Sequence, residues 1–319
     1  MLKVTSLKGE HLEDAALLVS QRYRRLCEQE PQLPRRYTEV SNLLPLLQNI
    51  WNATGSGVAA IQGNRLVGFL TGWQMPSFHG KRSVYSPEWA NAAELEDSSR
   101  IYEEMYSHLA AIWLADKYIA HYISLFPNDV GALKAWNWMG FGMFAVDAIR
   151  NLDPIQVDAV DFHIKRAESG DIEQVIELQD ALWQYMKSAP IFLISDKRDR
   201  AYYEEWLGNT DKAVWLAYSH DEPVAFMRLG PADDEVCAII YDENTTSVFA
   251  AFTKENARGE GIATALLDHA LTSARELGYE RCAVPFEPMN LLGTRFWLKY
   301  FKPVCYSVLR IVDDRVANA

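Results

Sequence analysis

The sequence predicts an α/β protein made of two similar domains in tandem. Three segments of the first half resemble three segments of the second half, in the same order and about 160 residues apart. Each half also begins with a short strand that leads into an amphipathic helix. Chance can produce one such resemblance, whereas three in one order favour the repetition of a single α/β domain.

The paired segments predict the same elements in both halves. They are residues 4–15 with 164–175, residues 57–70 with 213–227, and residues 128–131 with 290–293. The first pair is typical of a strand, a turn and an acidic helix start. In the second pair, apolar stretches flank Gly63 and Asn64 in one half and His220 and Asp221 in the other, which predicts two β-hairpins. The third pair opens an aromatic-rich helix in each half.

The segment at residues 151–160 divides the two halves. It contains a proline and two aspartates and has no clear hydrophobic period, which is typical of a connection between domains. We therefore expect domains at residues 1–153 and 161–319.

Composition limits the classes of partner. The chain has 319 residues, of which 49% are hydrophobic and 23% charged, and is long enough for two soluble globular domains. The formal charge of −12 argues against nucleic acid, since phosphate binding needs a basic face. An acidic surface suits a cationic acceptor such as an amine, and equally suits simple solubility. Residues 1–9 contain no long apolar run, and no stretch is long enough to span a membrane, so we expect a cytoplasmic protein without a signal peptide or a membrane partner.

The cysteines and histidines predict no metal site. Cys27, Cys237, Cys282 and Cys305 are far apart in the sequence and form no CxxC pair, which suits reduced thiols that fill core space. The seven histidines include no HExxH motif.

One segment of the second half has the order strand, glycine-bearing loop, helix. An apolar, β-rich run at residues 246–253 is followed, after the polar segment at residues 254–257, by Arg258-Gly-Glu-Gly-Ile-Ala. From Ile262 apolar residues recur on one helix face as far as Leu277, and Gly278 is suited to end that helix. Such a loop presents unpaired backbone N–H groups and the positive end of the helix dipole, which predicts a phosphate or pyrophosphate site.

Two common phosphate-binding motifs do not fit this loop. The dinucleotide fingerprint needs a third glycine where Thr264 stands, and a P-loop needs a Gly-Lys-Ser/Thr sequence that is absent. A glycine turn that only caps a core helix is a further alternative. Two glycines that flank Glu260 directly after Arg258 are more than such a cap requires.

Residues 258–263 resemble the Arg/Gln-x-x-Gly-x-Gly/Ala signature of the GNAT N-acetyltransferases, whose loop holds the pyrophosphate of coenzyme A. The strand before the loop, the helix after it, the strand at residues 281–286 and Asn290 resemble the family as well. The closing helix and strand at residues 294–313 are similar to the family's C-terminal motif. The detailed resemblance covers about half of the chain, and the first half joins it only through the repeat.

The resemblance implies a fold, a cofactor and a reaction. Each domain would hold a mixed, mostly antiparallel twisted sheet flanked by helices, in a tandem arrangement similar to that of the mycothiol synthases. The cofactor would be acetyl-CoA, bound in the second half. The protein would be an N-acetyltransferase that moves the acetyl group to a primary amine of a small-molecule acceptor.

The resemblance also assigns roles to residues of the second half. The backbone of the loop would bind the pyrophosphate, with a hydroxyl from Thr264 near the helix start. The strand end would run beside the pantetheine arm, and Asn290 would contact that arm. The implied cofactor-binding residues are Ala251, Phe252, Thr253, Arg258, Gly259, Glu260, Gly261, Ile262, Ala263, Thr264 and Asn290.

The proposed proton donor departs from the family pattern. Many GNAT enzymes use a tyrosine of the last helix to protonate the departing thiolate, but the family's Phe-Tyr pair falls on Phe296 and Trp297. An indole N–H is a donor and not an acid, so Trp297 cannot serve. Tyr300, nearly a turn later, is our candidate catalytic residue, and Tyr306 on the following strand is an alternative with a stronger case for core packing.

A base must take a proton from the attacking amine. Glu287, just past the strand that ends at Phe286, is our candidate. Asp242 and Glu243, at another strand end, are alternatives.

The first half lacks the phosphate loop. Residues 86–100 contain no glycine, and Glu94, Glu96 and Asp97 would repel a pyrophosphate. We expect this degenerate domain to shape the acceptor cleft and to stabilise the active half. Two other functions stay open: a non-catalytic acyl-CoA-binding or regulatory protein, and an enzyme that acetylates a protein N-terminus or lysine.

Overall fold

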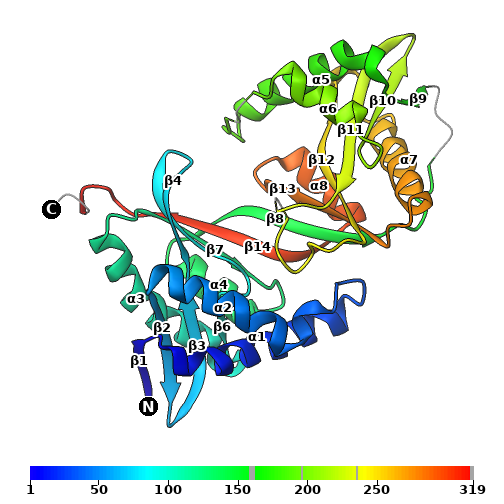
Figure 1. Ribbon diagram of the computed structural model, residues 1–319. Coiled ribbons are helices and arrows are strands. Elements are labelled where there is room, and N and C mark those ends of the chain that lie inside the picture. The colour runs from blue at the N-terminus through cyan, green and yellow to red at the C-terminus, as the bar shows by residue number, and fades with distance from the viewer. Residues whose placement is uncertain (158–161, 195–196, 235, 317–319) are drawn as a thin grey trace. The chain divides into compact units, whose positions relative to one another are not determined.

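The computed structural model describes residues 1–157, 162–194, 197–234 and 236–316. In this part the chain forms eight α-helices and fourteen strands, which divide into two compact units (Figure 1). Unit 1 holds Met1–Asp147, Cys237–Ile239 and Pro303–Ala319, and unit 2 holds Ala148–Val236 and Ile240–Lys302. No helix among the described residues is both long and apolar enough to cross a membrane.

Unit 1 begins with a strand and two helices and continues with hairpins. Its elements are β1 (Leu2–Ser6), α1 (Leu12–Gln29), α2 (Val40–Thr54), β2 (Gly57–Gln62), β3 (Arg65–Thr71), β4 (Trp73–Phe78), β5 (Lys81–Ser86), β6 (Asn91–Ala93), α3 (Ser98–Ala115), β7 (Ala120–Leu125) and α4 (Val130–Trp138). The long strand β8 (Gly142–Asn151) then passes from unit 1 into unit 2.

Unit 2 repeats this order without the β4–β5 hairpin. Its elements are β9 (His163–Arg166), α5 (Ile172–Lys187), α6 (Arg200–Gly208), β10 (Ala213–Ser219), β11 (Glu222–Pro231), β12 (Thr245–Thr253), α7 (Ile262–Glu276), β13 (Arg281–Phe286) and α8 (Leu291–Tyr300). Strand β14 (Lys302–Ile311) follows and returns the chain to unit 1.

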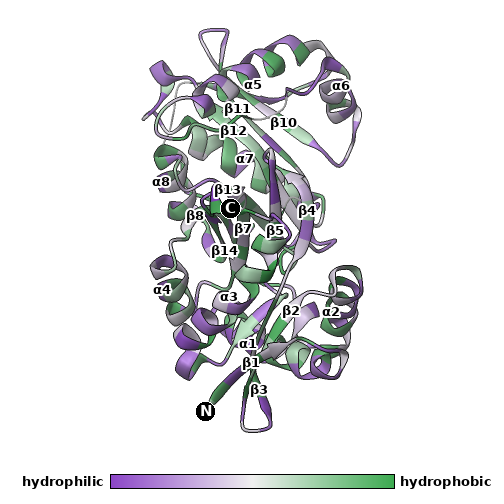
Figure 2. Ribbon diagram, turned by 90° about the vertical axis from the view of Figure 1, so that its left-hand side faces the viewer, coloured by the Kyte–Doolittle hydropathy of each residue, from purple (hydrophilic) through white to green (hydrophobic). Residues whose placement is uncertain are grey.

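Both predicted hairpins are present. β2 and β3 pair antiparallel around a turn whose Gly63 has a φ of 65°, and the turn is drawn as hydrophilic in Figure 2. β10 and β11 pair antiparallel around His220 and Asp221, with φ of 50° and 67°. Positive φ at both central residues of a two-residue turn matches the right-handed twist of the strands.

The sheets are mixed and mostly antiparallel, as predicted. In unit 1, β1, β2, β3 and β6 form one sheet in that order, and β4, β5, β7 and β14 are hydrogen-bonded neighbours in another. Five described strands of unit 2 lie in the order β13, β12, β11, β10, β9. Among them the β12–β13 pair is parallel and the other three pairs are antiparallel.

The last strand does not stay with its own half. β14 pairs antiparallel with β7 of unit 1, from Tyr306 opposite Leu125 to Ile311 opposite Ala120. β14 covers the edge of β7, a strand that is buried along its whole length, and thereby satisfies its backbone groups. The closing helix and strand therefore lie in different units. The units differ from the expected ranges 1–153 and 161–319 at residues 148–153, 237–239 and 303–319.

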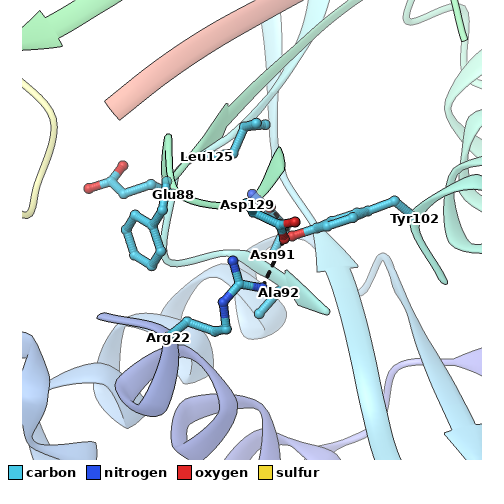
Figure 3. Close-up of a pocket in the computed structure, with 8 residues that line it drawn as sticks. Arg22, Glu88, Asn91, Ala92, Tyr102, Leu125 and Asp129 are labelled. Atoms are coloured by element: carbon cyan, nitrogen blue, oxygen red, sulfur yellow. Dashed lines mark hydrogen bonds and ion pairs between the residues drawn. The ribbon is translucent and has the colours of Figure 1, made fainter. Parts of the chain in front are cut away.

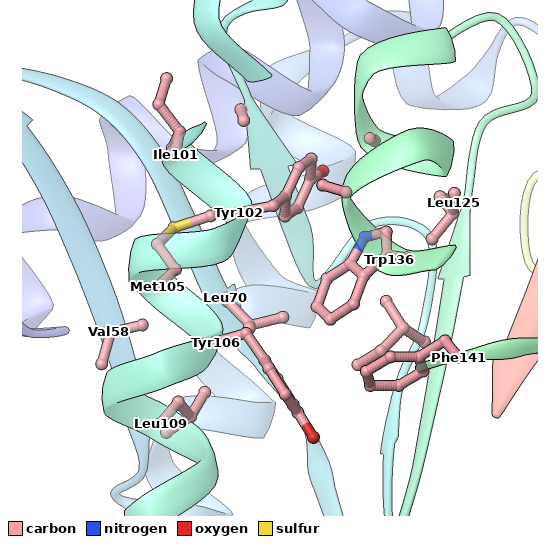
Figure 4. Close-up of a cluster of buried hydrophobic side chains, with 14 of the residues drawn as sticks. Val58, Leu70, Ile101, Tyr102, Met105, Tyr106, Leu109, Leu125, Trp136 and Phe141 are labelled. Atoms are coloured by element: carbon pink, nitrogen blue, oxygen red, sulfur yellow. The ribbon is translucent and has the colours of Figure 1, made fainter. Parts of the chain in front are cut away.

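The core of unit 1 is rich in aromatic side chains (Figure 4). Trp136 contacts Tyr106 and Phe141 edge to face, with ring centroids 5.4 and 4.8 Å apart. Trp136 and Phe141 are buried, whereas Trp138, the last residue of α4, is 77% exposed. α3 places Ile101, Met105 and Leu109 in this core at helical spacing.

A buried ion pair lies where β6 and β7 approach α1 and α4 (Figure 3). Arg22 is 2.9 Å from a carboxylate oxygen of Asp129 and donates to the Ala93 carbonyl at 2.6 Å. The Asn91 amide donates to the Ser124 carbonyl at 2.9 Å and so links β6 to β7. Only about 10 Å³ of space remains between these side chains, so protein atoms fill this part of unit 1.

Replacing Asp129 by alanine should destabilise unit 1 by about 3–5 kcal/mol, because the substitution leaves Arg22 buried without its counter-charge. The same carboxylate also caps α4 by accepting from the Ala132 amide, and it accepts from the Ser98 hydroxyl, both at 2.8 Å. Urea unfolding followed by circular dichroism measures the change. Asp97→Ala is the matched control, since Asp97 precedes α3 without making a cap hydrogen bond and is exposed. Equal unfolding of the two variants would contradict this account.

Candidate functional site

The loop between β12 and α7 has the conformation of an anion site. Gly259 and Gly261 have φ of 87° and 83°, values at which a side chain is strained. α7 begins at Ile262, directly after Gly261, and the amides of residues 259–264 donate no hydrogen bond within the described part of the chain. The loop is exposed from Gly259 to Gly261. The amides and the positive end of the α7 dipole are therefore available to an anion.

β12 and β13 diverge next to this loop. Their parallel register covers only Thr245–Ser247 opposite Arg281–Ala283. On its other side β12 stays paired with β11 as far as Thr253. The end of β12, which includes Ala251 and Phe252, therefore has one edge without a strand partner among the described residues. Its outward amides and carbonyls can pair with an extended ligand.

The Arg258 side chain turns back onto β12. Its Nε donates to the Thr253 carbonyl at 3.0 Å, and its guanidinium carbon lies 5.0 Å from the ring centre of Tyr185 and 5.8 Å from that of Phe252. The side chain thus fixes the loop to the strand end. The Arg258 amide itself donates to the Glu255 carbonyl at 3.3 Å, so the free amides of the loop begin at Gly259.

Asn290 has a structural role. It precedes α8 and accepts from the Gly293 amide at 3.1 Å, as an N-cap residue does. The Tyr185 hydroxyl also donates to it at 3.1 Å, so Tyr185 joins Asn290 to Arg258. Tyr185 was not among the predicted site residues, because nothing in its neighbourhood on α5 distinguishes it from a packing residue.

The cap also corrects the register of the repeat. Asp129 caps α4 through the Ala132 amide just as Asn290 caps α8 through the Gly293 amide. Asn290 therefore corresponds to Asp129. The predicted alignment of residues 128–131 with 290–293 had paired it with Asn128, one position earlier.

Tyr300 and Thr264 lie together. The Tyr300 hydroxyl is 2.9 Å from Thr264 Oγ1, which joins the last residue of α8 to the first turn of α7. The structure thus brings the candidate proton donor to the helix that follows the glycine loop. Trp297 is buried between Phe296 and Phe301. Tyr306 lies on β14 in unit 1.

Glu287 follows β13 at the same edge of the sheet as the loop. Because β12 and β13 are parallel, the ends at Thr253 and Phe286 point the same way. Burial raises the pKa of the Glu287 carboxyl above its usual value, and a hydrogen bond with its own backbone lowers it by less. A carboxyl with a raised pKa is a stronger base near neutral pH than an exposed one.

The two alternative bases lie at the opposite end of these strands. Asp242 precedes β12 and is paired with Arg281, the first residue of β13, at 2.9 Å. Glu243 is exposed beside it. Neither carboxylate is at the edge that carries the glycine loop.

Comparisons with known proteins agree with this geometry. The sequence profile of the acetyltransferase (GNAT) family matches residues 175–301. No curated protein matches the chain.

Two solved structures share the fold. One is a GCN5-related glucosamine N-acetyltransferase region of a fungal multi-domain GH3 β-N-acetylglucosaminidase, with a TM-score of 0.53 and 13% identity over 97% of this chain. The present chain spans 38% of that protein. The other is a GCN5-related N-acetyltransferase from Sphaerobacter thermophilus, with a TM-score of 0.52, 11% identity, and coverage of 97% of this chain and 95% of that one. The fold of the whole chain is thus GNAT-like, and its second half is a domain of the GNAT acetyltransferase family.

Proposed function

We propose that this protein transfers an acetyl group from acetyl-CoA to a primary amine of a small-molecule acceptor. The observation that carries the proposal is the set of free amides at residues 259–264, held by two glycines of positive φ beside the open edge of β12. An anion site and an open strand edge in succession suit a ligand with a pyrophosphate and an extended amide-bearing arm.

Acetyl-CoA would supply the activated acyl thioester. The amides of residues 259–264 would hold the pyrophosphate, with the Thr264 hydroxyl at the same helix start. The free edge of β12 at Ala251–Thr253 would pair with the arm and aim the thioester along the strand. An amide of that edge can polarise the thioester carbonyl without a special side chain.

Two side chains would move the protons. Glu287, directly or through a water molecule, would accept the proton that the amine loses as it attacks. Tyr300 would give its hydroxyl proton to the leaving sulfur, and Thr264, 2.9 Å away, would then donate to the phenolate oxygen. The enzyme regains its starting state when a proton passes from Glu287 to Tyr300 through solvent.

Replacing Gly261 by glutamate should weaken acetyl-CoA binding by about 100-fold or more, because a carboxylate next to a pyrophosphate costs several kcal/mol. Isothermal titration measures the dissociation constant. Gly278→Glu is the control, since Gly278 has a similar φ of 90° but lies beyond the opposite end of α7. Absence of binding by the folded wild type would refute the proposal. Binding without turnover of any amine would favour a non-catalytic acyl-CoA-binding protein.

Replacing Tyr300 by phenylalanine should lower kcat by about 10²–10⁴-fold and leave the KM for acetyl-CoA nearly unchanged, because the substitution removes the acid and keeps the ring. Thiol release with an accepted amine measures both constants. Tyr279→Phe, beyond the end of α7, should retain wild-type rates. A wild-type kcat in the Tyr300 variant would assign the proton to another donor.

The rate should fall as the pH drops through the raised pKa of Glu287, because the protonated carboxyl cannot accept the proton of the amine. Glu287→Gln should lower kcat/KM at neutral pH and remove this acid limb of the profile. Glu243→Gln, at the other end of the strands, should leave both unchanged. An acid limb that persists in the Glu287 variant would identify a different base.

A further inference from the structure

A group of metal-ligating side chains is buried in unit 1, outside the site described above. Asp147 of β8, Cys237 of the loop after β11 and Cys305 of β14 each place one ligand atom within 4.8 Å of the others. All three are buried. In a tetrahedral zinc site with bonds of about 2.3 Å to sulfur, two ligand atoms are about 3.8 Å apart, so the three side chains are near coordinating geometry.

Glu88 provides an independent observation. Its side chain is only 1% exposed, and its Oε2 has no hydrogen-bond partner in the structure. A buried carboxylate oxygen without a partner costs several kcal/mol unless a cation or a proton offsets its charge. Figure 3 shows the Glu88 carboxylate turned away from the Arg22–Asp129 pair.

The Glu88 carboxylate is directed to the Cys237 loop. Its Oε1 accepts from the Ile239 amide at 3.0 Å, and Asp147 Oδ1 accepts from the Cys237 amide at 3.0 Å. Arg36 donates to the Ala238 carbonyl of the same loop at 2.9 Å. Three side chains thus hold a three-residue loop in one conformation, which keeps the Cys237 thiol next to Cys305.

Asp147 and Glu88 bring two carboxyl groups into this buried region, and no basic side chain in the described part of the chain pairs with either of them. No lysine or arginine nitrogen of the described residues lies within ion-pair distance of Asp147 or Glu88. The Arg36 charge acts on Glu88 from a greater distance. A divalent cation is the missing positive charge that this arrangement would accept.

We propose that Asp147, Cys237 and Cys305 form a buried site for a thiophilic divalent cation. Glu88 lies outside this group of three and adds negative charge beside it, acting on all three side chains. Two thiolates with one carboxylate suit zinc, since sulfur ligands favour it over magnesium or calcium. On binding, each S–H bond is replaced by a metal–sulfur bond, the two thiol protons pass to solvent, and no group is oxidised or reduced. The ion would tie β8, the loop after β11 and β14 together, and its role would be structural.

The test is titration of the metal-free, reduced full-length protein with Co²⁺, whose bond to thiolate gives a charge-transfer absorption, followed by displacement with Zn²⁺. The wild type should bind one ion per chain with this absorption. Asp147→Asn keeps the oxygen that accepts from the Cys237 amide but removes the anionic ligand, and should weaken binding by about tenfold or more. Cys237→Ser and Cys305→Ser should each diminish the thiolate absorption.

The two other cysteines provide matched controls. Cys27 and Cys282 are also buried and lie outside the group, so Cys27→Ser and Cys282→Ser should bind Co²⁺ as the wild type does. Two results of the titration would overturn the proposal: no stoichiometric binding of Co²⁺, or binding without thiolate absorption. A protein mass that shows a Cys237–Cys305 disulfide persisting after treatment with reductant would overturn it as well. If the serine variants fail to fold, the Asp147→Asn affinity decides. None of these readouts depends on acetyl transfer.

Discussion

The parallel pairing of β12 with β13 covers three residue pairs and then stops, and the candidate site depends on where it stops. Had the pairing continued, the amides and carbonyls at the end of β12 would be bonded to β13 and unavailable to a ligand. Because both strands run in the same direction, their diverging ends lie at one edge, beside the glycine loop and Glu287. The early end of the β12–β13 ladder therefore leaves the free edge of β12, the start of α7 and the Glu287 carboxyl at the same edge of the sheet.

Unit 1 has the same order of elements but keeps the corresponding place closed. Asn91 links β6 to β7 by a side-chain hydrogen bond, and the Arg22–Asp129 pair occupies the space beneath. Residues 94–97, which connect β6 to α3, contain no glycine and therefore no counterpart of Gly259 and Gly261. The two units thus show how one backbone plan can serve either as a ligand site or as a packed interior, according to a few polar side chains.

Local signals predicted most of the elements. The apolar period from Ile262, the glycine at position 278 and the two hairpin turns depend on neighbours in the sequence, and α7, Gly278 and both hairpins lie where they were predicted. The partner of β14 was not predicted, because the residues of β14 indicate a strand but carry no information on which strand it pairs with. The contact of Tyr185 with Asn290 was not predicted either, since a contact between α5 and α8 leaves no local trace in the sequence.

The cysteine-containing group shows the limit of spacing arguments most clearly. Asp147, Cys237 and Cys305 come from segments that share no motif, and the absence of a CxxC pair suggested only core packing. Three-dimensional proximity arises because β8 and β14 meet in unit 1 with a loop whose neighbours belong to unit 2. Metal-binding patterns in sequence detect ligands on one hairpin or helix, and they cannot detect ligands that only the completed fold brings together.

The return of β14 to unit 1 has a consequence for folding during translation. During synthesis β7 emerges about 180 residues before the strand that covers its edge. The first unit cannot complete its sheet while it is being translated, and it must wait for the whole second unit to leave the ribosome. An uncovered strand edge is a template for association with other chains. The nascent protein therefore has a period of exposure during which chaperones would matter most, and β14 ends that period when it pairs with β7.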